Sequence, residues 1–290
     1  MWARVGVAQQ WERFAIIASD LVGPPKPVVR RIISRYAPEN LGGSQTITDK
    51  RAALIVGAGD GLGSSICKAF AREGLEVCFT RRARNEQKLA TLASEIEAEG
   101  GCAHGFGVDA REEDDMIALF DQIERDIGPL DVVVFNIGAN VPFKITDTTS
   151  RVYRKVWEMA AFAGFLTGRE AAKRMMPRGH GSILFTGATA SLRGAAGFSA
   201  FAGAKHALRA LAQSMARELG GEGIHVGHII VDGLMDGTFA RTNFPDVADR
   251  VEREEILSPD AVAAEYVHLW KQPRSAWTHE LDLRPWKEKF

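Results

Sequence analysis

The decapeptide LIVGAGDGLG, Leu54 to Gly63, decides the fold of this 290-residue chain. Its first three residues end an apolar run that begins at Ala52, the glycines follow at once, and an amphipathic stretch starts at Ser64. A strand that turns this tightly into a helix needs residues free at positive φ, and it leaves backbone N–H groups open to a phosphate at the helix N-terminus. The pattern predicts a dinucleotide-binding turn, with a plain glycine-rich turn as the alternative.

Beyond this turn, short apolar runs alternate with long amphipathic stretches, which is typical of a parallel sheet covered by helices on both faces. The expected strands are residues 52–56, 76–80, a weaker run near 106–108, 131–135, 182–186, 224–231 and a final edge strand within 277–283. The expected helices are residues 64–73, 85–99, 112–125, 150–176, 200–219 and 259–270. We therefore expect an α/β fold, a Rossmann-type doubly wound parallel sheet, in a single domain over residues 50–290.

Residues 1–49 form a predicted N-terminal extension. The stretch Gly23 to Pro27 cannot continue a helix and divides the extension into two short amphipathic helices. Up to Asn40, six basic residues stand against three acidic ones. Such a segment is compatible with a mitochondrial address, with a clamp on the domain's own surface, or with an arm that docks onto a larger protein complex. We favour the docking arm.

The composition excludes several classes of protein. With 46% hydrophobic and 25% charged residues the chain is not disordered, and a net charge of -1 provides no global field that would recruit nucleic acid. Three cysteines fit neither a disulfide framework nor a zinc site, and the sequence predicts no metal ligands. A reducing compartment follows, either the mitochondrial matrix or the cytoplasm. Because no 18 apolar residues run uninterrupted, we expect no transmembrane segment.

The spacing G-x-x-x-G-x-G of the loop resembles the short-chain dehydrogenase/reductase family, and the resemblance extends over about residues 50–283. It is supported by FNIG at 135–138, a partial match to the family's N-N-A-G, and by Asp109, which matches an aspartate that binds adenine. The resemblance implies a dinucleotide and, often, a homo-oligomer. The cofactor-binding residues that it implies are Gly57, Gly61, Leu62, Gly63, Arg81, Arg82, Asp109, Asn136, Gly138 and Lys205.

The end of the second strand predicts which dinucleotide is bound. An NAD enzyme places a carboxylate there to accept hydrogen bonds from the ribose, whereas an NADP enzyme needs cations for the 2'-phosphate. This chain has Arg81 and Arg82, which favours NADP(H). A solvated charge cluster is the alternative. The sequence departs from the pattern at Asp60, since many NADP-preferring relatives carry a basic residue there.

The catalytic positions of the family are largely replaced. In relatives a tyrosine donates the proton and a lysine four residues later lowers its pKa; here Phe201 precedes Lys205, so the lysine alone is retained. The serine position falls on Ala188 and the asparagine position on Ala160. The chain is similar to a subgroup of the family that has Phe in place of the tyrosine. Ordinary carbonyl reduction would lose both its acid and its electrostatic donor.

Two functions remain open at this point. In the first, the protein binds NADP(H) but serves as a non-catalytic structural or regulatory subunit of a larger assembly. In the second, it is an NADPH-dependent oxidoreductase acting on an unidentified carbonyl or alcohol with a non-standard proton donor. Thr189 is the better nearby candidate, as a hydroxyl that contacts the substrate, and His206 is a weaker candidate for the catalytic acid. His225 and His228 lie three apart on an expected strand, hence on opposite faces, which argues against a metal pair.

Overall fold

The computed structural model describes residues 50–288, so the predicted extension at residues 1–49 lies outside the described residues. Seven parallel strands form one sheet in the order β3-β2-β1-β4-β5-β6-β7. The strands are β1 (Ala52–Val56), β2 (Glu76–Arg81), β3 (Cys102–Gly107), β4 (Leu130–Phe135), β5 (Gly181–Thr186), β6 (Ile224–Val231) and β7 (Glu280–Leu283). The order reverses between β1 and β4, which confirms the predicted doubly wound sheet.

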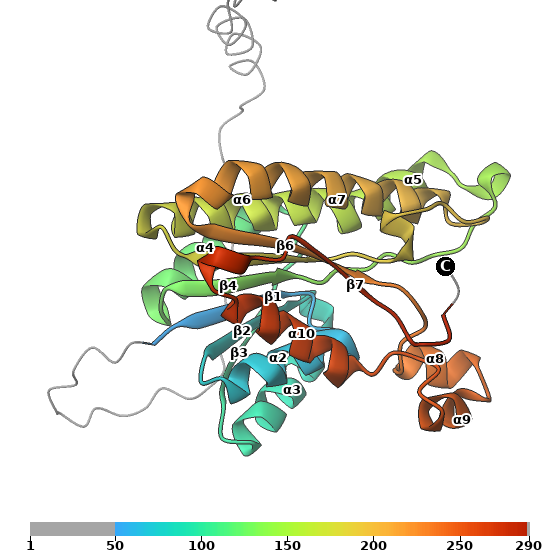
Figure 1. Ribbon diagram of the computed structural model, residues 1–290, viewed down its shortest axis with the longest axis horizontal. Helices are drawn as coiled ribbons and strands as arrows, with labels where there is room; N and C mark the ends of the chain where they lie inside the picture. The colour runs from blue at the N-terminus through green and yellow to red at the C-terminus, as the bar shows by residue number, and fades with distance from the viewer. Residues whose placement is uncertain (1–49, 289–290) are drawn as a thin grey trace, which may run out of the picture. The chain divides into compact units, whose positions relative to one another are not determined.

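Helices cover both faces of the sheet (Figure 1). The helices are α2 (Leu62–Arg72), α3 (Glu86–Ala98), α4 (Glu113–Asp126), α5 (Ser150–Trp157), α6 (Ala163–Met175), α7 (Ser199–Leu219), α8 (Thr238–Asn243), α9 (Val247–Glu252) and α10 (Pro259–Lys271). One apolar core joins the sheet to α4, α6 and α7, and a second joins its other face to α2, α3 and α10. Central strands such as β1 and β4 are buried along their whole length, as burial on both faces requires.

The structure departs from the predicted elements in three places. The third strand begins at Cys102, well before the weak run that was expected, because His104, Gly105 and Gly107 dilute its apolar pattern. The helix expected over 150–176 is interrupted by a π-helical turn at Glu158–Phe162. The segment between β6 and α10, for which the sequence predicts no helix, contains α8 and α9.

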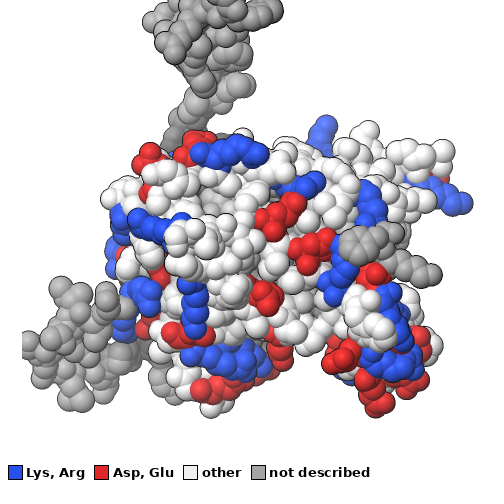
Figure 2. Space-filling model, in the orientation of Figure 1, with Lys and Arg blue, Asp and Glu red and all other residues white. Residues whose placement is uncertain are grey.

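The described residues show how charged side chains are distributed over the surface and how apolar the helices are. On the face shown in Figure 2, cationic and anionic side chains are interspersed over the body formed by the described residues. Within residues 50–288, no helix combines the length and the apolarity needed to cross a bilayer.

Candidate functional site

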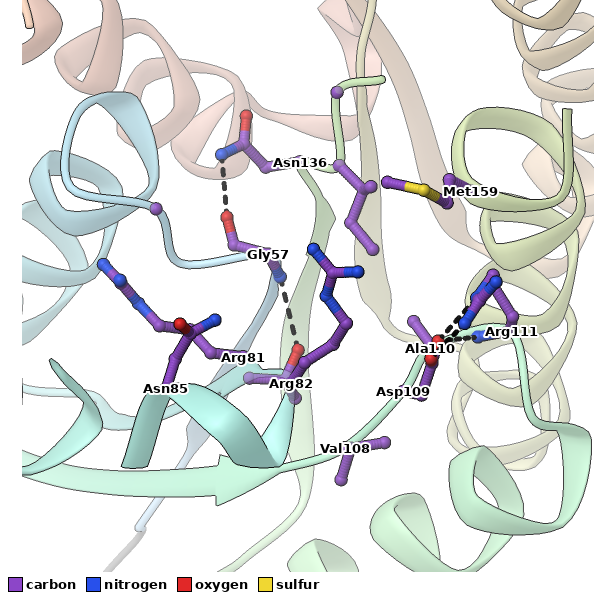
Figure 3. A pocket seen from close by; sticks show the side chains of 14 residues that line it. Gly57, Arg81, Arg82, Asn85, Val108, Asp109, Ala110, Arg111, Asn136 and Met159 are labelled. Atoms are coloured by element: carbon purple, nitrogen blue, oxygen red, sulfur yellow. Dashed lines mark hydrogen bonds and ion pairs between the residues drawn. The ribbon is translucent and has the colours of Figure 1, made fainter. Parts of the chain in front are cut away.

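A pocket lies at the carboxyl ends of β1, β2, β3 and β4, where the order of the strands reverses (Figure 3). Doubly wound sheets bind ligands in this crevice. Six of the residues predicted to bind the cofactor line it together, namely Gly57, Arg81, Arg82, Asp109, Asn136 and Gly138. Gly61, Leu62 and Gly63 belong to the turn and to the first residues of α2, beside the pocket.

The glycine turn is shaped by two close approaches. Gly57 has a φ of +100°, and a Cβ there would lie 2.8 Å from Ile137 Cγ1. A Cβ at Gly63 would lie 2.6 Å from the carbonyl oxygen of Gly57, so α2 packs directly on the turn. Gly59 and Gly61, in contrast, face open space. Since no side chain caps the N-terminus of α2, the turn presents bare backbone to a ligand.

Asn136 connects the turn to the end of β4. Its side-chain amide donates a 3.0 Å hydrogen bond to the carbonyl oxygen of Gly57, and its backbone N–H donates to Val56 O at 2.8 Å (Figure 3). On the other side, the backbone N–H of Gly57 donates to the Thr80 hydroxyl at 3.3 Å. The strands β1, β2 and β4 therefore hold the turn in one position.

The two adjacent arginines at the end of β2 point in different directions. Arg81 runs toward the glycine turn and pairs with Asp60 at 2.5 Å, whereas Arg82 rises into the middle of the pocket (Figure 3). No acidic side chain among residues 50–288 forms an ion pair with Arg82. The pKa of Asp109 is lowered chiefly by a hydrogen bond from Arg111, and the charge of Arg82 lowers it further. Arg82 is thus a half-buried cation that is available to an anionic ligand.

Asp109 follows β3 at the far wall of the pocket. Its carboxylate accepts hydrogen bonds from Arg111 Nε at 2.9 Å and from the Arg111 backbone N–H at 3.2 Å. These bonds hold the pKa of Asp109 below its usual value, so the carboxyl is ionised at neutral pH. The ion pair fixes the direction of the Asp109 side chain at the pocket wall.

Lys205 lies in the interior with its ammonium between the ends of β4 and β5. Its Nζ donates to Thr186 O at 2.7 Å and to Ile137 O at 3.2 Å. The side chain is 2% exposed, and burial lowers the pKa of Lys205 to about 7. Two neutral carbonyls stabilise the charge less than a carboxylate would, because they carry only partial charges.

The three residues that the sequence predicts at the other catalytic positions lie in one apolar region. Ala160 and Phe201 belong to a buried apolar cluster, and the partly buried Ala188 packs against it. The Phe201 ring lies 5.9 Å from Lys205 Nζ, centroid to nitrogen, and Ala160 is fully buried. These three predicted positions therefore carry apolar side chains in apolar surroundings.

The polar neighbours considered from sequence have partners elsewhere. The Thr189 hydroxyl donates to the buried carboxylate of Asp232 at the end of β6. His206 is exposed and its Nδ1 lies 2.9 Å from Ala202 O, on the side of α7 away from buried Lys205. His206 is therefore poorly placed for proton transfer in the centre.

The two histidines of β6 have separate partners. His225 stacks on Trp277 with ring centroids 5.0 Å apart, and its Nε2 lies 2.9 Å from Thr278 O. His228 is fully buried and its Nδ1 lies 3.0 Å from a Glu280 oxygen. Burial lowers the pKa of His228 to about 4, so this imidazole is neutral. Each ring contributes to the attachment of β7 to the sheet.

Comparison with known proteins identifies the family. The model of the short chain dehydrogenase family matches residues 51–247. The chain is 30% identical over 188 residues to gluconate 5-dehydrogenase of Gluconobacter oxydans, covering 65% of this chain and 71% of that one. It is 27% identical over 220 residues to sorbitol-6-phosphate 2-dehydrogenase of Escherichia coli, with coverages of 75% and 83%. The chain belongs to the short-chain dehydrogenase/reductase family.

Solved structures have the same fold. A short-chain dehydrogenase from Rhodopseudomonas palustris is 48% identical, with a TM-score of 0.70, and the match covers 81% of this chain and 99% of that one. A point variant of actinorhodin polyketide ketoreductase, solved with NADPH, is 23% identical with a TM-score of 0.73 over 82% of this chain and 97% of its own. At that identity the second likeness establishes the fold alone.

Proposed function

We propose that the protein binds NADP(H) in the pocket at the ends of β1 to β4. The backbone of the glycine turn and the N-terminus of α2 receive the pyrophosphate, and Asp109 lies at the adenine end. Arg82 is the cation for the 2'-phosphate, because it enters the pocket and has no acidic partner among the described residues. Asn136, Gly138 and Lys205 lie on the side of the nicotinamide ribose.

The proposed role of the protein is that of a non-catalytic structural or regulatory subunit. One observation carries this proposal: Ala160 and Phe201 lie in a buried apolar cluster with Ala188 packed against it, at the positions where relatives need hydrogen-bond donors. A bound NADPH would supply a hydride, but this cluster holds no proton for a substrate oxygen. Loss of positioned acid catalysis alone lowers a rate by about 10²- to 10⁴-fold.

Binding and turnover separate this role from catalysis. Purified protein titrated with NADPH should change the fluorescence of the dinucleotide at micromolar concentrations, whereas a panel of ketones, aldehydes and keto acids should leave its absorbance at background. NADPH consumption with one of these carbonyls would contradict the non-catalytic role. Absence of binding would contradict the dinucleotide proposal itself.

A second candidate function is an NADPH-dependent oxidoreductase with a non-standard proton donor. The observation that favours it is Lys205, since an ammonium whose burial lowers its pKa to about 7 can hold or release a proton at neutral pH. If this function is correct, Lys205→Ala abolishes turnover of a carbonyl that the wild type reduces. Turnover unaffected by that substitution would exclude Lys205 as the donor.

Replacement of Arg82 tests the cofactor assignment. We expect Arg82→Ala to raise the dissociation constant of NADPH by about 10- to 100-fold, because a charge-assisted contact to the 2'-phosphate is lost, and that of NADH by less than about threefold. Fluorescence titration with each dinucleotide measures both dissociation constants. The matched control is Arg84→Ala, which removes an exposed arginine two residues away. Equal losses for NADPH and NADH would refute the role of Arg82.

Assembly is the remaining part of the proposal. The outer side of α5 and α6 exposes Tyr153, Trp157 and Phe165, at 44%, 41% and 39%, which favours contact with a second copy or another protein. We propose that residues 1–49 add a docking arm. Two variants test these contacts: deletion of residues 1–45 tests the docking arm, and Trp157→Glu tests the exposed side of α5 and α6. Light scattering measures the mass of the particle, and co-purification shows which proteins accompany it. A particle of unchanged mass and composition in both variants would contradict the proposal.

A further inference from the structure

A second cleft, distinct from the dinucleotide pocket, lies at the start of α5 and has a volume of about 380 Å³. It is lined by Arg111, Ser150, Arg151, Arg154, Lys155 and Glu158. Four of these six side chains are cations and one is an anion, so the lining is strongly positive although the whole chain carries a net charge of -1. Because Arg111 also lines the dinucleotide pocket, the two hollows adjoin.

Most of the positive charge in this cleft is not neutralised by the chain. Arg111 is the exception, since its Nε donates to Asp109 at 2.9 Å and its Nη1 lies 3.9 Å from a Glu158 oxygen. The three cations of α5 are exposed and form no ion pair within residues 50–288; they are Arg151, Arg154 and Lys155. These three side chains are available to an anion from outside the described part of the chain.

The next helix shows the opposite arrangement. In α6, which follows α5 after the π-helical turn, Arg169 and Lys173 each pair with Glu170 at 2.9 Å. Arg174 pairs with the other oxygen of Glu170 at 2.7 Å. The cations of α6 are thus neutralised by a carboxylate of their own helix, whereas those of α5 are left to repel one another.

This repulsion acts along one side of α5. Arg151 lies three residues before Arg154 and four before Lys155, spacings that make helical side chains neighbours. Like charges at these spacings destabilise a helix, and the first turn of α5 holds no acidic side chain that would offset them. An anion seated between the three cations would therefore stabilise the protein as well as bind to it.

Phosphate chemistry matches this cleft best. An arginine can donate two parallel N–H bonds to a phosphate, and a phosphate ester carries up to about two negative charges. The volume of about 380 Å³ is that of a site for a small molecule. The segment 1–49 of the same chain matches the cleft less well, because up to Asn40 it has six basic residues against three acidic ones and is itself cationic.

We propose that the cleft at the start of α5 binds a small phosphorylated molecule, other than the dinucleotide, through Arg151, Arg154 and Lys155. Arg111 remains paired with Asp109 and separates the two sites. This inference goes beyond the proposed dinucleotide binding and does not depend on it. Its contacts are charge-assisted and exposed, so binding weakens as salt is added.

Titration calorimetry of the full chain with inorganic pyrophosphate tests the site, with saturating NADPH present so that the glycine turn is filled. We expect saturable binding with a dissociation constant of about 0.1–1 mM at low ionic strength. The double variant Arg151→Gln with Arg154→Gln should raise this constant by at least about tenfold, because two charge-assisted contacts are lost. Sodium chloride at the same ionic strength should give no saturable heat.

The matched control is Lys173→Gln with Arg217→Gln, which removes two exposed helical cations outside the cleft and changes the net charge equally. It should leave the affinity for pyrophosphate unaltered. Equal affinity of the wild type and the α5 double variant would overturn the proposal. Binding that appears only after deletion of residues 1–45 would also overturn it, since that segment would then be what occupies the cleft.

Thermal unfolding without added anion provides an independent measurement. The midpoint of the α5 double variant should equal that of the wild type or exceed it by about 1–2 °C, because repulsion between like charges is relieved. A midpoint lower by more than about 2 °C would contradict the proposal, since the two arginines would then serve the fold. A wild type that binds no NADPH would reject the dinucleotide function, and the comparison of pyrophosphate affinities would still decide the role of the cleft.

Discussion

The double variant Phe201→Tyr with Ala188→Ser should raise carbonyl reductase activity above the wild-type level. The first substitution would place a phenol beside Lys205, because the Phe201 ring already lies 5.9 Å from the lysine nitrogen. The second would introduce, on the loop after β5, a hydroxyl that can donate to the substrate oxygen. Positioned acid catalysis contributes about 10²- to 10⁴-fold and an electrostatic donor about 10²- to 10³-fold, so NADPH consumption should rise at least about 100-fold above the wild-type background.

An asparagine at Ala160, the third apolar position, is best introduced after the other two substitutions. Ala160 is fully buried in the π-helical turn, and a larger asparagine there costs about 1–3 kcal/mol of overpacking unless neighbours shift. The Phe201→Leu variant is the control for a change of side chain without a hydroxyl. If the double variant folds and binds NADPH but consumes none across the carbonyl panel, the active centre has lost its geometry as well as its side chains.

Replacing Lys205 by methionine should change how stability depends on pH. Burial lowers the pKa of this lysine from 10.5 in the unfolded chain to about 7 in the folded one. Between these values the unfolded chain binds the extra proton, so the free energy of unfolding of the wild type rises with pH by about 1.4 kcal/mol per unit. Lys205→Met has no such group. From about pH 7 to about pH 9.5 the wild type should gain about 3 kcal/mol relative to the variant.

Urea unfolding of both proteins at a series of pH values measures this difference. Every other titrating group is common to the two chains, so the test needs only the change with pH in the difference between their free energies of unfolding. The lost hydrogen bonds to Thr186 O and Ile137 O add a constant to that difference. The substitution His206→Ala is the control for a change at an exposed neighbour of Lys205 on α7, and it should leave the wild-type pH dependence of stability in place. A pH-independent difference between wild type and Lys205→Met would mean that Lys205 is charged and solvated in the folded protein.

The sequence was sufficient for the elements whose patterns are strong and local. The apolar run over residues 52–56 predicts β1 to the residue. The predicted start of the last helix at residue 259 agrees with α10, where the Ser258 hydroxyl accepts from the Ala261 N–H. Elements with mixed composition were harder. The strand β3 contains two glycines and a histidine, and the π-helical turn at Glu158–Phe162 has no signature beyond small and apolar residues.

The site was predictable as a list of residues but not as an arrangement. Gly57, Asp109 and Asn136 follow strands that end at one edge, so their meeting could be expected from the parallel sheet. The opposite directions of Arg81 and Arg82 could not, because they depend on Asp60, which is 21 residues away from Arg81 in the chain. The gathering of Ala160, Ala188 and Phe201 around one apolar cluster likewise depends on the tertiary structure.

The strand order has a kinetic consequence. The β1 strand lies between β2 and β4, and its residue Val56 pairs with Thr80 on one side and with Phe135 on the other. The second of these contacts closes a long loop, which is slow to form. A refolding chain that has paired β1 only with β2 possesses one wall of the pocket without the other. Dinucleotide binding should therefore be among the last signals to recover during refolding, after the helices have formed.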